Sequence, residues 1–108
     1  MARRILVTGA ASGLGAALVR AFRERGDDVL ATDRVADHVD LALDITSDAD
    51  WAAALTAVEE RWGGLDVLVN NAGVAGGGRL DLATIDEWQW IFDINLFGMV
   101  RGLRTFTP

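Results

Sequence analysis

Apolar residues in this chain fall into short runs separated by glycine, aspartate and arginine. Runs in which consecutive positions are apolar predict strands buried on both faces, as in a parallel sheet. Four strands are expected, at residues 4–7, 29–32, 39–43 and 65–69. The third alternates apolar and polar residues and is expected to be short.

Two helices are predicted between these strands. From Leu14, apolar side chains recur at intervals of three and four residues until Gly26, which provides a C-terminal stop. Ser47 with Asp50 forms a variant N-cap box before a second helix, whose apolar face runs from Trp51 to residue 62. Both helices are expected to pack on the sheet.

A long third helix is predicted over residues 85–106, because Thr84 with Glu87 forms a capping box. A stripe on it recurs at intervals of four and three residues: Trp88, Phe92, Asn95, Met99, Gly102 and Phe106. Asn95 is its one strongly polar member, and a buried amide needs a hydrogen-bond partner or a water. Other apolar residues lie off the stripe, so we expect one face to meet the sheet and another to form a homo-oligomer.

Alternating strands and helices predict an α/β fold with a Rossmann-like, doubly wound parallel sheet. Only residues 34–43 separate Asp33 from Asp44, too few for a strand and a full crossover helix, so the second helix is expected to be reduced to a turn. The expected strand order is 3-2-1-4, with the fourth strand at an open edge. Because an open apolar edge can pair with another chain, we expect oligomerisation, strand exchange or poor solubility.

A glycine-rich corner, Val7-Thr8-Gly9-Ala10-Ala11-Ser12-Gly13-Leu14-Gly15, joins the first strand to the first helix. Glycines bring main-chain N–H groups close to a ligand, and the N-terminus of a helix carries partial positive charge. The corner therefore predicts a phosphate or pyrophosphate site formed by Gly9, Ala11, Ser12, Gly13, Leu14 and Gly15. A tight turn with close strand–helix packing is the alternative explanation.

Asp33 ends the second strand, eighteen residues after Gly15. A dinucleotide fold uses an acidic residue at about this distance to bind the adenosine ribose hydroxyls. Its carboxylate would repel a 2′-phosphate, which favours NAD over NADP. Arg34 weakens that preference, because a guanidinium there can pair with such a phosphate. A turn residue that caps the strand is the alternative for Asp33.

The spacing of the corner, Thr-Gly-x-x-x-Gly-x-Gly, and the later stretch Asn70-Asn71-Ala72-Gly73 together resemble the two hallmark motifs of the short-chain dehydrogenase/reductase family. The resemblance spans the whole chain but only the N-terminal part of the family. It implies that Asp44 and Ile45 lie near an adenine ring, although a generic strand-end aspartate would also explain Asp44. It also implies that Asn71, by side-chain hydrogen bonds, and Ala72 and Gly73, by close approach, lie along the cofactor.

The stretch Asn95-Leu96-Phe97-Gly98 resembles a further family feature. In the family such an asparagine shapes the active-site helix and holds a water in a proton relay. The resemblance therefore makes Asn95 the candidate catalytic residue, with a structurally satisfied core asparagine as the alternative.

The family's catalytic serine, tyrosine and lysine have no match here. The sequence contains no tyrosine and no lysine, and its serines are Ser12 and Ser47. Hydride transfer between nicotinamide and a carbonyl or alcohol needs a proton exchanged at the oxygen. We expect residues 1–108 to be one partial dinucleotide-binding domain without its C-terminal catalytic part, and inactive alone. The favoured function is the N-terminal segment of an NAD(P)-dependent oxidoreductase; a stand-alone dinucleotide-binding module and a nonfunctional truncated product are the alternatives.

Composition excludes several other classes of protein. The net charge of -6 argues against a nucleic-acid partner. The chain lacks cysteine, and its one histidine, His38, lies in a polar link, so no metal site is expected. No apolar run reaches the roughly 18 residues that cross a bilayer, and no signal peptide precedes the first strand. We expect a cytoplasmic protein that begins at Met1, with a flexible loop at residues 76–78.

Overall fold

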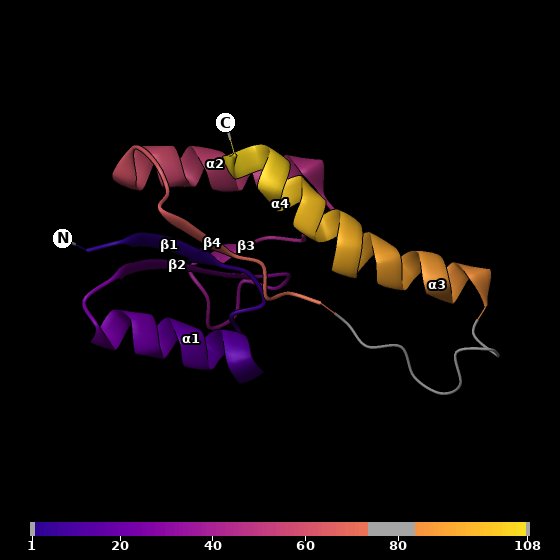
Figure 1. Cartoon of the computed structure of the whole chain (residues 1–108), viewed down its shortest axis with the longest axis horizontal. Helices are drawn as coiled ribbons and strands as arrows, with labels where there is room; N and C mark the ends of the chain where they lie inside the picture. The colour runs from indigo at the N-terminus through magenta and orange to yellow at the C-terminus, as the bar shows by residue number, and fades with distance from the viewer. Residues whose placement is uncertain (1, 74–83, 108) are drawn as a thin grey trace.

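The computed structural model describes residues 2–73 and 84–107. A parallel four-stranded sheet with the order β3-β2-β1-β4 forms its centre (Figure 1). The strands are β1 (Arg4–Val7), β2 (Asp28–Asp33), β3 (Leu41–Ala42) and β4 (Val67–Val69). The predicted fold class and strand order are confirmed, while the predicted loop at residues 76–78 lies outside the described residues.

Helices cover both faces of the sheet (Figure 1). α1 (Gly13–Glu24) lies on one face, and α2 (Asp48–Trp62) lies on the other beside α4 (Gly98–Phe106). Successive side chains of a strand point to opposite faces. Leu6 therefore joins the core cluster that contains residues of α2, whereas Ile5 and Val7 join the cluster that contains Val19 of α1. The consecutive apolar residues of β1 thus fill two cores.

β3 is shorter than the predicted strand at residues 39–43, because an aspartate side chain replaces part of the ladder. The backbone N–H of Asp40 donates to the carbonyl of Ala31 at 2.8 Å, and the Asp40 carboxylate accepts from the N–H of Ala31 at 2.8 Å. Arg23 donates to the same carboxylate at 2.9 Å. Asp66 pairs with both backbone groups of Arg4 in the same way, at 2.9 and 2.8 Å, and β4 begins one residue later.

The link between Asp33 and Asp40 contains no helix, as predicted. His38 lies in this link with an exposed side chain and a φ of 63°. Among the described residues, no helix combines the length and apolar character needed to traverse a bilayer.

The predicted helix over residues 85–106 is one helical run interrupted by a π-helical segment. Its parts are α3 (Ile85–Phe92), η2 (Asp93–Phe97) and α4. Thr84 caps α3 by accepting from the backbone N–H of Glu87 at 3.1 Å, as the capping box predicts. π-helical turns interrupt the α-helical register and are frequent at functional sites. This one contains Asn95.

The predicted stripe on this helical run coincides with its buried face only in part. Phe92 and Met99 are exposed and Asn95 is only partly buried, whereas Gly98 and Gly102 are buried. A Cβ at Gly98 would lie 2.5 Å from Cδ1 of Ile45, and one at Gly102 would lie 2.7 Å from the Trp51 ring. Small residues therefore let α4 approach the core, where Phe106 also packs, while Met99, Val100 and Leu103 remain exposed.

Candidate functional site

A cleft of about 440 Å³ opens at the carboxyl ends of the strands. Open α/β sheets bind their ligands at this edge. The lining residues follow the four strands or belong to the helical run after them: Gly9, Asp33, Arg34, Leu43, Asp44, Ile45, Thr46, Ala72, Gly73, Trp90, Asp93 and Ile94. The structure thus brings together many of the residues predicted for cofactor binding. Ala11, Ser12, Gly13, Leu14, Gly15, Asn71 and Asn95 are outside the lining set.

Two different structural constraints explain why glycine occupies three positions of the corner. A Cβ at Gly9 would lie 2.9 Å from Cα of Ala72, and one at Gly15 would collide with the carbonyl oxygen of Gly9. At Gly13 a Cβ would meet nothing within 4 Å, but φ is +59°, a conformation that favours glycine. Close packing therefore explains Gly9 and Gly15, and backbone conformation explains Gly13.

The buried hydroxyl of Thr8 joins the corner to the segment after β4. It accepts from the backbone N–H groups of Asn71 at 3.1 Å and Ala72 at 3.0 Å, and it donates to the carbonyl of Val69 at 3.3 Å. The Asn71 amide donates to the carbonyl of Gly9 at 3.2 Å. The predicted side-chain role of Asn71 is thus directed, in this structure, at the corner itself.

The N-terminus of α1 is open. Ser12 is the N-cap residue, but its side chain makes no capping hydrogen bond, and the first turn contains no acidic residue. The first N–H groups of a helix lack intrahelical acceptors and carry partial positive charge. Ser12 and Leu14 are exposed beside them. A phosphate group fits this helix end in charge and in access.

The carboxylate of Asp33 is held in the cleft by the backbone. One oxygen accepts from the N–H of Ala11 at 2.9 Å, and the other accepts from the N–H of Arg34 at 2.7 Å. The glycine corner therefore orients the Asp33 side chain through the N–H of Ala11 without help from a ligand. Arg34 lines the same cleft, so this end of the cleft contains both an acidic and a basic residue.

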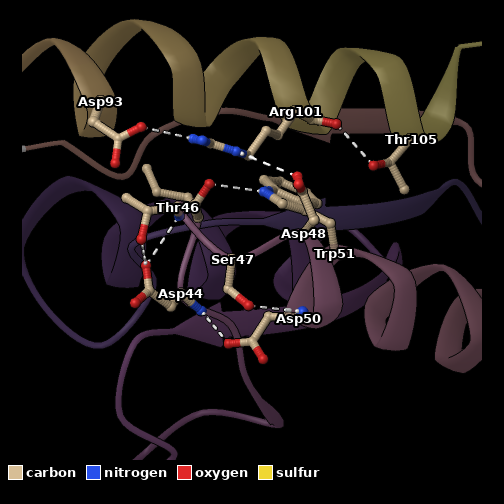
Figure 2. Close-up of polar contacts among 10 residues, drawn as sticks. Asp44, Thr46, Ser47, Asp48, Asp50, Trp51, Asp93, Arg101 and Thr105 are labelled. Carbon is tan, nitrogen blue, oxygen red and sulfur yellow. Dashed lines mark hydrogen bonds and ion pairs between the residues drawn. The ribbon is translucent and has the colours of Figure 1, made fainter.

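Asp44 lines the same cleft from the loop after β3, and Figure 2 shows its contacts with Thr46. Its carboxylate accepts from the hydroxyl of Thr46 at 2.7 Å and from the backbone N–H of Thr46 at 2.9 Å. These hydrogen bonds lower the pKa of Asp44 below its ordinary value, and the charges of Arg34 and Arg101 lower it further. Asp44 is therefore an ionised acceptor at neutral pH.

The loop that carries Asp44 is fixed to the start of α2 (Figure 2). Ser47 accepts from the N–H of Asp50 at 3.1 Å, as predicted, but the Asp50 carboxylate accepts from the N–H of Asp44 at 2.8 Å instead of completing the cap box. The indole of Trp51 donates to the carbonyl of Ile45 at 2.9 Å. The N–H of Asp44 and the carbonyl of Ile45 are thus both held by side chains of α2.

The wall formed by the helical run is tied to the same helix (Figure 2). Arg101 on α4 binds Asp93 at 3.0 Å and Asp48, in the first turn of α2, at 3.3 Å. Asn95 lies next to the backbone of the segment after β4, because a Cβ at Gly73 would be 2.9 Å from its side-chain oxygen. The candidate catalytic residue is therefore beside the cleft rather than in it.

Sequence reasoning missed six residues that build this site: Thr8, Leu43, Thr46, Trp90, Asp93 and Ile94. Thr46 follows an aspartate by two residues, a spacing typical of an Asx turn, and this signal was available. Trp90 and Asp93 are placed by where the π-helical turn falls, which side-chain type alone does not reveal. Among the described residues, no group of three or more acidic, histidine or cysteine side chains is placed to hold a metal ion.

The sequence matches the family described as short chain dehydrogenase over residues 3–108. The chain belongs to the short-chain dehydrogenases. A 3-alpha-(or 20-beta)-hydroxysteroid dehydrogenase of Mycobacterium tuberculosis is 40% identical over 92% of this chain and 43% of its own length. The NADP-dependent 3-hydroxy acid dehydrogenase YdfG of Escherichia coli is 33% identical over 96% of this chain and 47% of its own length.

Solved structures agree with this family membership. A short-chain dehydrogenase from Streptomyces avermitilis superposes with a TM-score of 0.93 at 33% identity, covering 100% of this chain and 44% of the other. A 3-ketoacyl-(acyl-carrier-protein) reductase from Brucella melitensis, complexed with NADH, superposes with a TM-score of 0.90 at 30% identity, covering 98% and 49%. This short-chain dehydrogenase chain thus spans about half the length of the relatives it matches, and it corresponds to their N-terminal part. Among these relatives, the Escherichia coli enzyme is named as NADP-dependent and the Brucella melitensis structure contains NADH.

Proposed function

We propose that this chain is the dinucleotide-binding segment of an NAD(P)-dependent oxidoreductase. The observation that carries the proposal is the cleft at the carboxyl ends of the strands, which is lined by Asp33 and Asp44, together with the uncapped N-terminus of α1 that follows β1 at the same edge of the sheet. An open helix end suits a pyrophosphate, and a carboxylate at the end of β2 suits the hydroxyls of a ribose. The two features match neighbouring parts of one dinucleotide, because the adenosine ribose is linked directly to the pyrophosphate.

Each part of the cofactor would have its own contacts in this arrangement. The backbone at residues 12–15 would hold the pyrophosphate, and Asp33 would accept hydrogen bonds from the adenosine ribose. Asp44 and Ile45 would line the adenine site, and Ala72 and Gly73 would let the cofactor lie against the backbone. Gly9, Ala11 and Asn71 would keep the corner in shape, because Gly9 packs closely on Ala72, the N–H of Ala11 donates to Asp33 and the amide of Asn71 donates to Gly9.

The bound nicotinamide would supply hydride transfer. The residues of this chain would bind and orient it, and Asn95, beside Gly73, would hold a water for proton transfer. The acid/base group that exchanges the substrate proton would come from residues that this sequence does not contain. For the whole protein we propose a substrate that interconverts between an alcohol and a carbonyl, since the named relatives are hydroxysteroid and hydroxy acid dehydrogenases.

We further propose that NAD is preferred over NADP. The cleft carries the carboxylates of Asp33 and Asp44 at one end, and both would repel a 2′-phosphate. Arg34 would attract it, but its charge already acts on Asp44, whose pKa it helps to lower. Two anions against one partly compensated cation therefore favour the cofactor without the extra phosphate.

Titration of NADH and NADPH into the protein tests both proposals, with Asp33→Asn as the informative variant. Asparagine retains one oxygen that can accept from Ala11, and it removes the negative charge together with the oxygen that accepts from the N–H of Arg34. We expect wild-type protein to bind NADH more tightly, and Asp33→Asn to weaken NADH on the order of ten-fold while narrowing the preference over NADPH. Asp37→Asn, in the adjacent exposed link, is the control and should change neither affinity.

Failure of wild-type protein to bind either nucleotide would refute dinucleotide binding. Unchanged discrimination in Asp33→Asn would remove Asp33 from its proposed role and leave binding itself intact.

A further inference from the structure

Trp90 is a large aromatic side chain at the cleft that is half exposed among the described residues. It is 51% exposed, although it lines the same cleft as Asp44 and Ile45. A half-exposed indole ring at the rim of a cleft has an apolar face that a ligand can cover. None of the predicted cofactor contacts uses this residue.

The helical turn that carries Trp90 is anchored toward the cleft. Ile94, four residues on, packs against the core cluster that contains Leu43 and Ile45. Residues four apart lie close together on a helical surface. Asp93 is also fixed, because Arg101 binds it and Asp48 at once (Figure 2). The indole therefore extends the apolar wall of the cleft outward from a supported position.

The chemistry at this end of the cleft suits a flat heteroaromatic ring. Apolar side chains of Leu43, Ile45 and Ile94 line it, and Asp44 supplies an ionised acceptor at its edge. An adenine ring has two apolar faces and an exocyclic amino group that donates hydrogen bonds. Although Asp44 already accepts from Thr46, a carboxylate has about four acceptor sites and can take a further donor.

We propose that Trp90 stacks on the adenine ring of the bound nucleotide and is a major source of adenine affinity in this chain. The inference rests on the proposed function, since it assumes that a dinucleotide occupies the cleft. Base–aromatic stacking depends on the exposed face of the indole and needs no hydrogen bond from it. The contribution should therefore be shared by every ligand that contains adenine.

Trp88 provides a matched control on the same helix. It stacks on Phe92 with ring centroids 5.8 Å apart and is not among the residues that line the cleft. Replacing Trp88 removes an indole of equal size two positions away. Trp90→Phe keeps an aromatic face, whereas Trp90→Ala removes it.

Calorimetric titration with 5′-AMP, ADP-ribose, NADH and nicotinamide mononucleotide tests the inference. We expect Trp90→Ala to weaken the three adenine-containing ligands by about 5- to 100-fold and Trp90→Phe to weaken them much less. Nicotinamide mononucleotide should be unaffected by either change. Trp88→Ala should leave all four affinities within about two-fold of wild type, because its ring faces Phe92.

Two failures are distinguishable. If wild-type protein binds NADH and 5′-AMP and Trp90→Ala binds them equally well, the stacking role is wrong and the proposed function stands. If wild-type protein binds none of the four ligands, the proposed function fails and the role of Trp90 fails with it. A Trp90→Ala variant that changes oligomeric state in light scattering at unchanged affinity would identify Trp90 as a subunit contact and would also overturn the stacking role.

Discussion

Replacing Thr8 with valine should destabilise the protein far more than its single missing hydroxyl suggests. The side chain is 1% exposed, so no water replaces the lost oxygen. The N–H of Ala72 would lose its acceptor, which lies at 3.0 Å. The N–H of Asn71 would lose one of its two acceptors, because it also donates to the carbonyl of Val69 at 3.0 Å. The Val69 carbonyl would keep the N–H of Thr8 at 3.1 Å.

The magnitude follows from these three partners. An unsatisfied buried N–H costs about 1–3 kcal/mol, and losing one shared bond costs about 0.5–1.5 kcal/mol. We therefore expect the free energy of unfolding to fall by about 2–4 kcal/mol in Thr8→Val. Thr8→Ser keeps the hydroxyl and loses one methyl group, which should cost only about 1 kcal/mol.

Urea unfolding followed by circular dichroism measures both differences. The ordering wild type, Thr8→Ser, Thr8→Val in decreasing stability supports the role of the hydroxyl. If Thr8→Val is as stable as Thr8→Ser, the hydroxyl does not hold the corner to the segment after β4, and the reasoning is refuted.

Two further predictions concern the start of β4 and the seat of α4. Arg4 lowers the pKa of Asp66 to about 2, so this pair stabilises the fold above the unfolded pKa of about 3.9 and stops doing so as pH falls toward 2. Thermal melts should give Asp66→Asn a lower melting temperature than wild type at pH 7, and this difference should close between about pH 4 and 2. A difference in melting temperature that persists at low pH would contradict the assignment. Gly98→Ala should lower the free energy of unfolding by about 1–3 kcal/mol, because its Cβ would lie 2.5 Å from Ile45, although the same change in an open helix is normally stabilising. Met99→Ala, at the exposed neighbour, should change it by no more than about 0.5 kcal/mol, and equal effects of the two changes would show that close approach of α4 is not the cause.

The sheet and its order could be predicted because their signals are local and redundant. β1 is apolar at consecutive positions, and the glycine corner follows it at once, so strand, turn and helix all agree. The prediction of a phosphate site at the N-terminus of α1 is local in the same way, because an uncapped helix end depends on the residues around Ser12. Much of the predicted cofactor set meets in one cleft because parallel strands end at one edge.

Other features depend on side chains that act across long distances in the sequence. The length of β3 is set by the Asp40 carboxylate, which replaces a ladder hydrogen bond to Ala31. Gly98 and Gly102 are both buried on the last helical run, but the predicted stripe includes only Gly102 of the two and also includes the exposed Phe92 and Met99. The π-helical turn then decides which residues reach the cleft. Hydrophobic periodicity does not reveal a side chain that replaces a backbone hydrogen bond of the sheet. It also does not reveal a π-helical turn that changes the helical register.

The central position of β1 has a consequence for how the chain folds during synthesis. Its pairing with β2 spans 24 residues, but its pairing with β4 spans 62. At ribosomal speeds of about 5–20 residues per second, the roughly 40 residues between these events take about 2–8 seconds to appear. A β1–β2 pair must wait through that interval with one flank of its middle strand unpaired. Long-range pairing of this kind slows folding and leaves a nascent strand open to wrong partners, so cells with scarce chaperones should yield less of this protein in folded form.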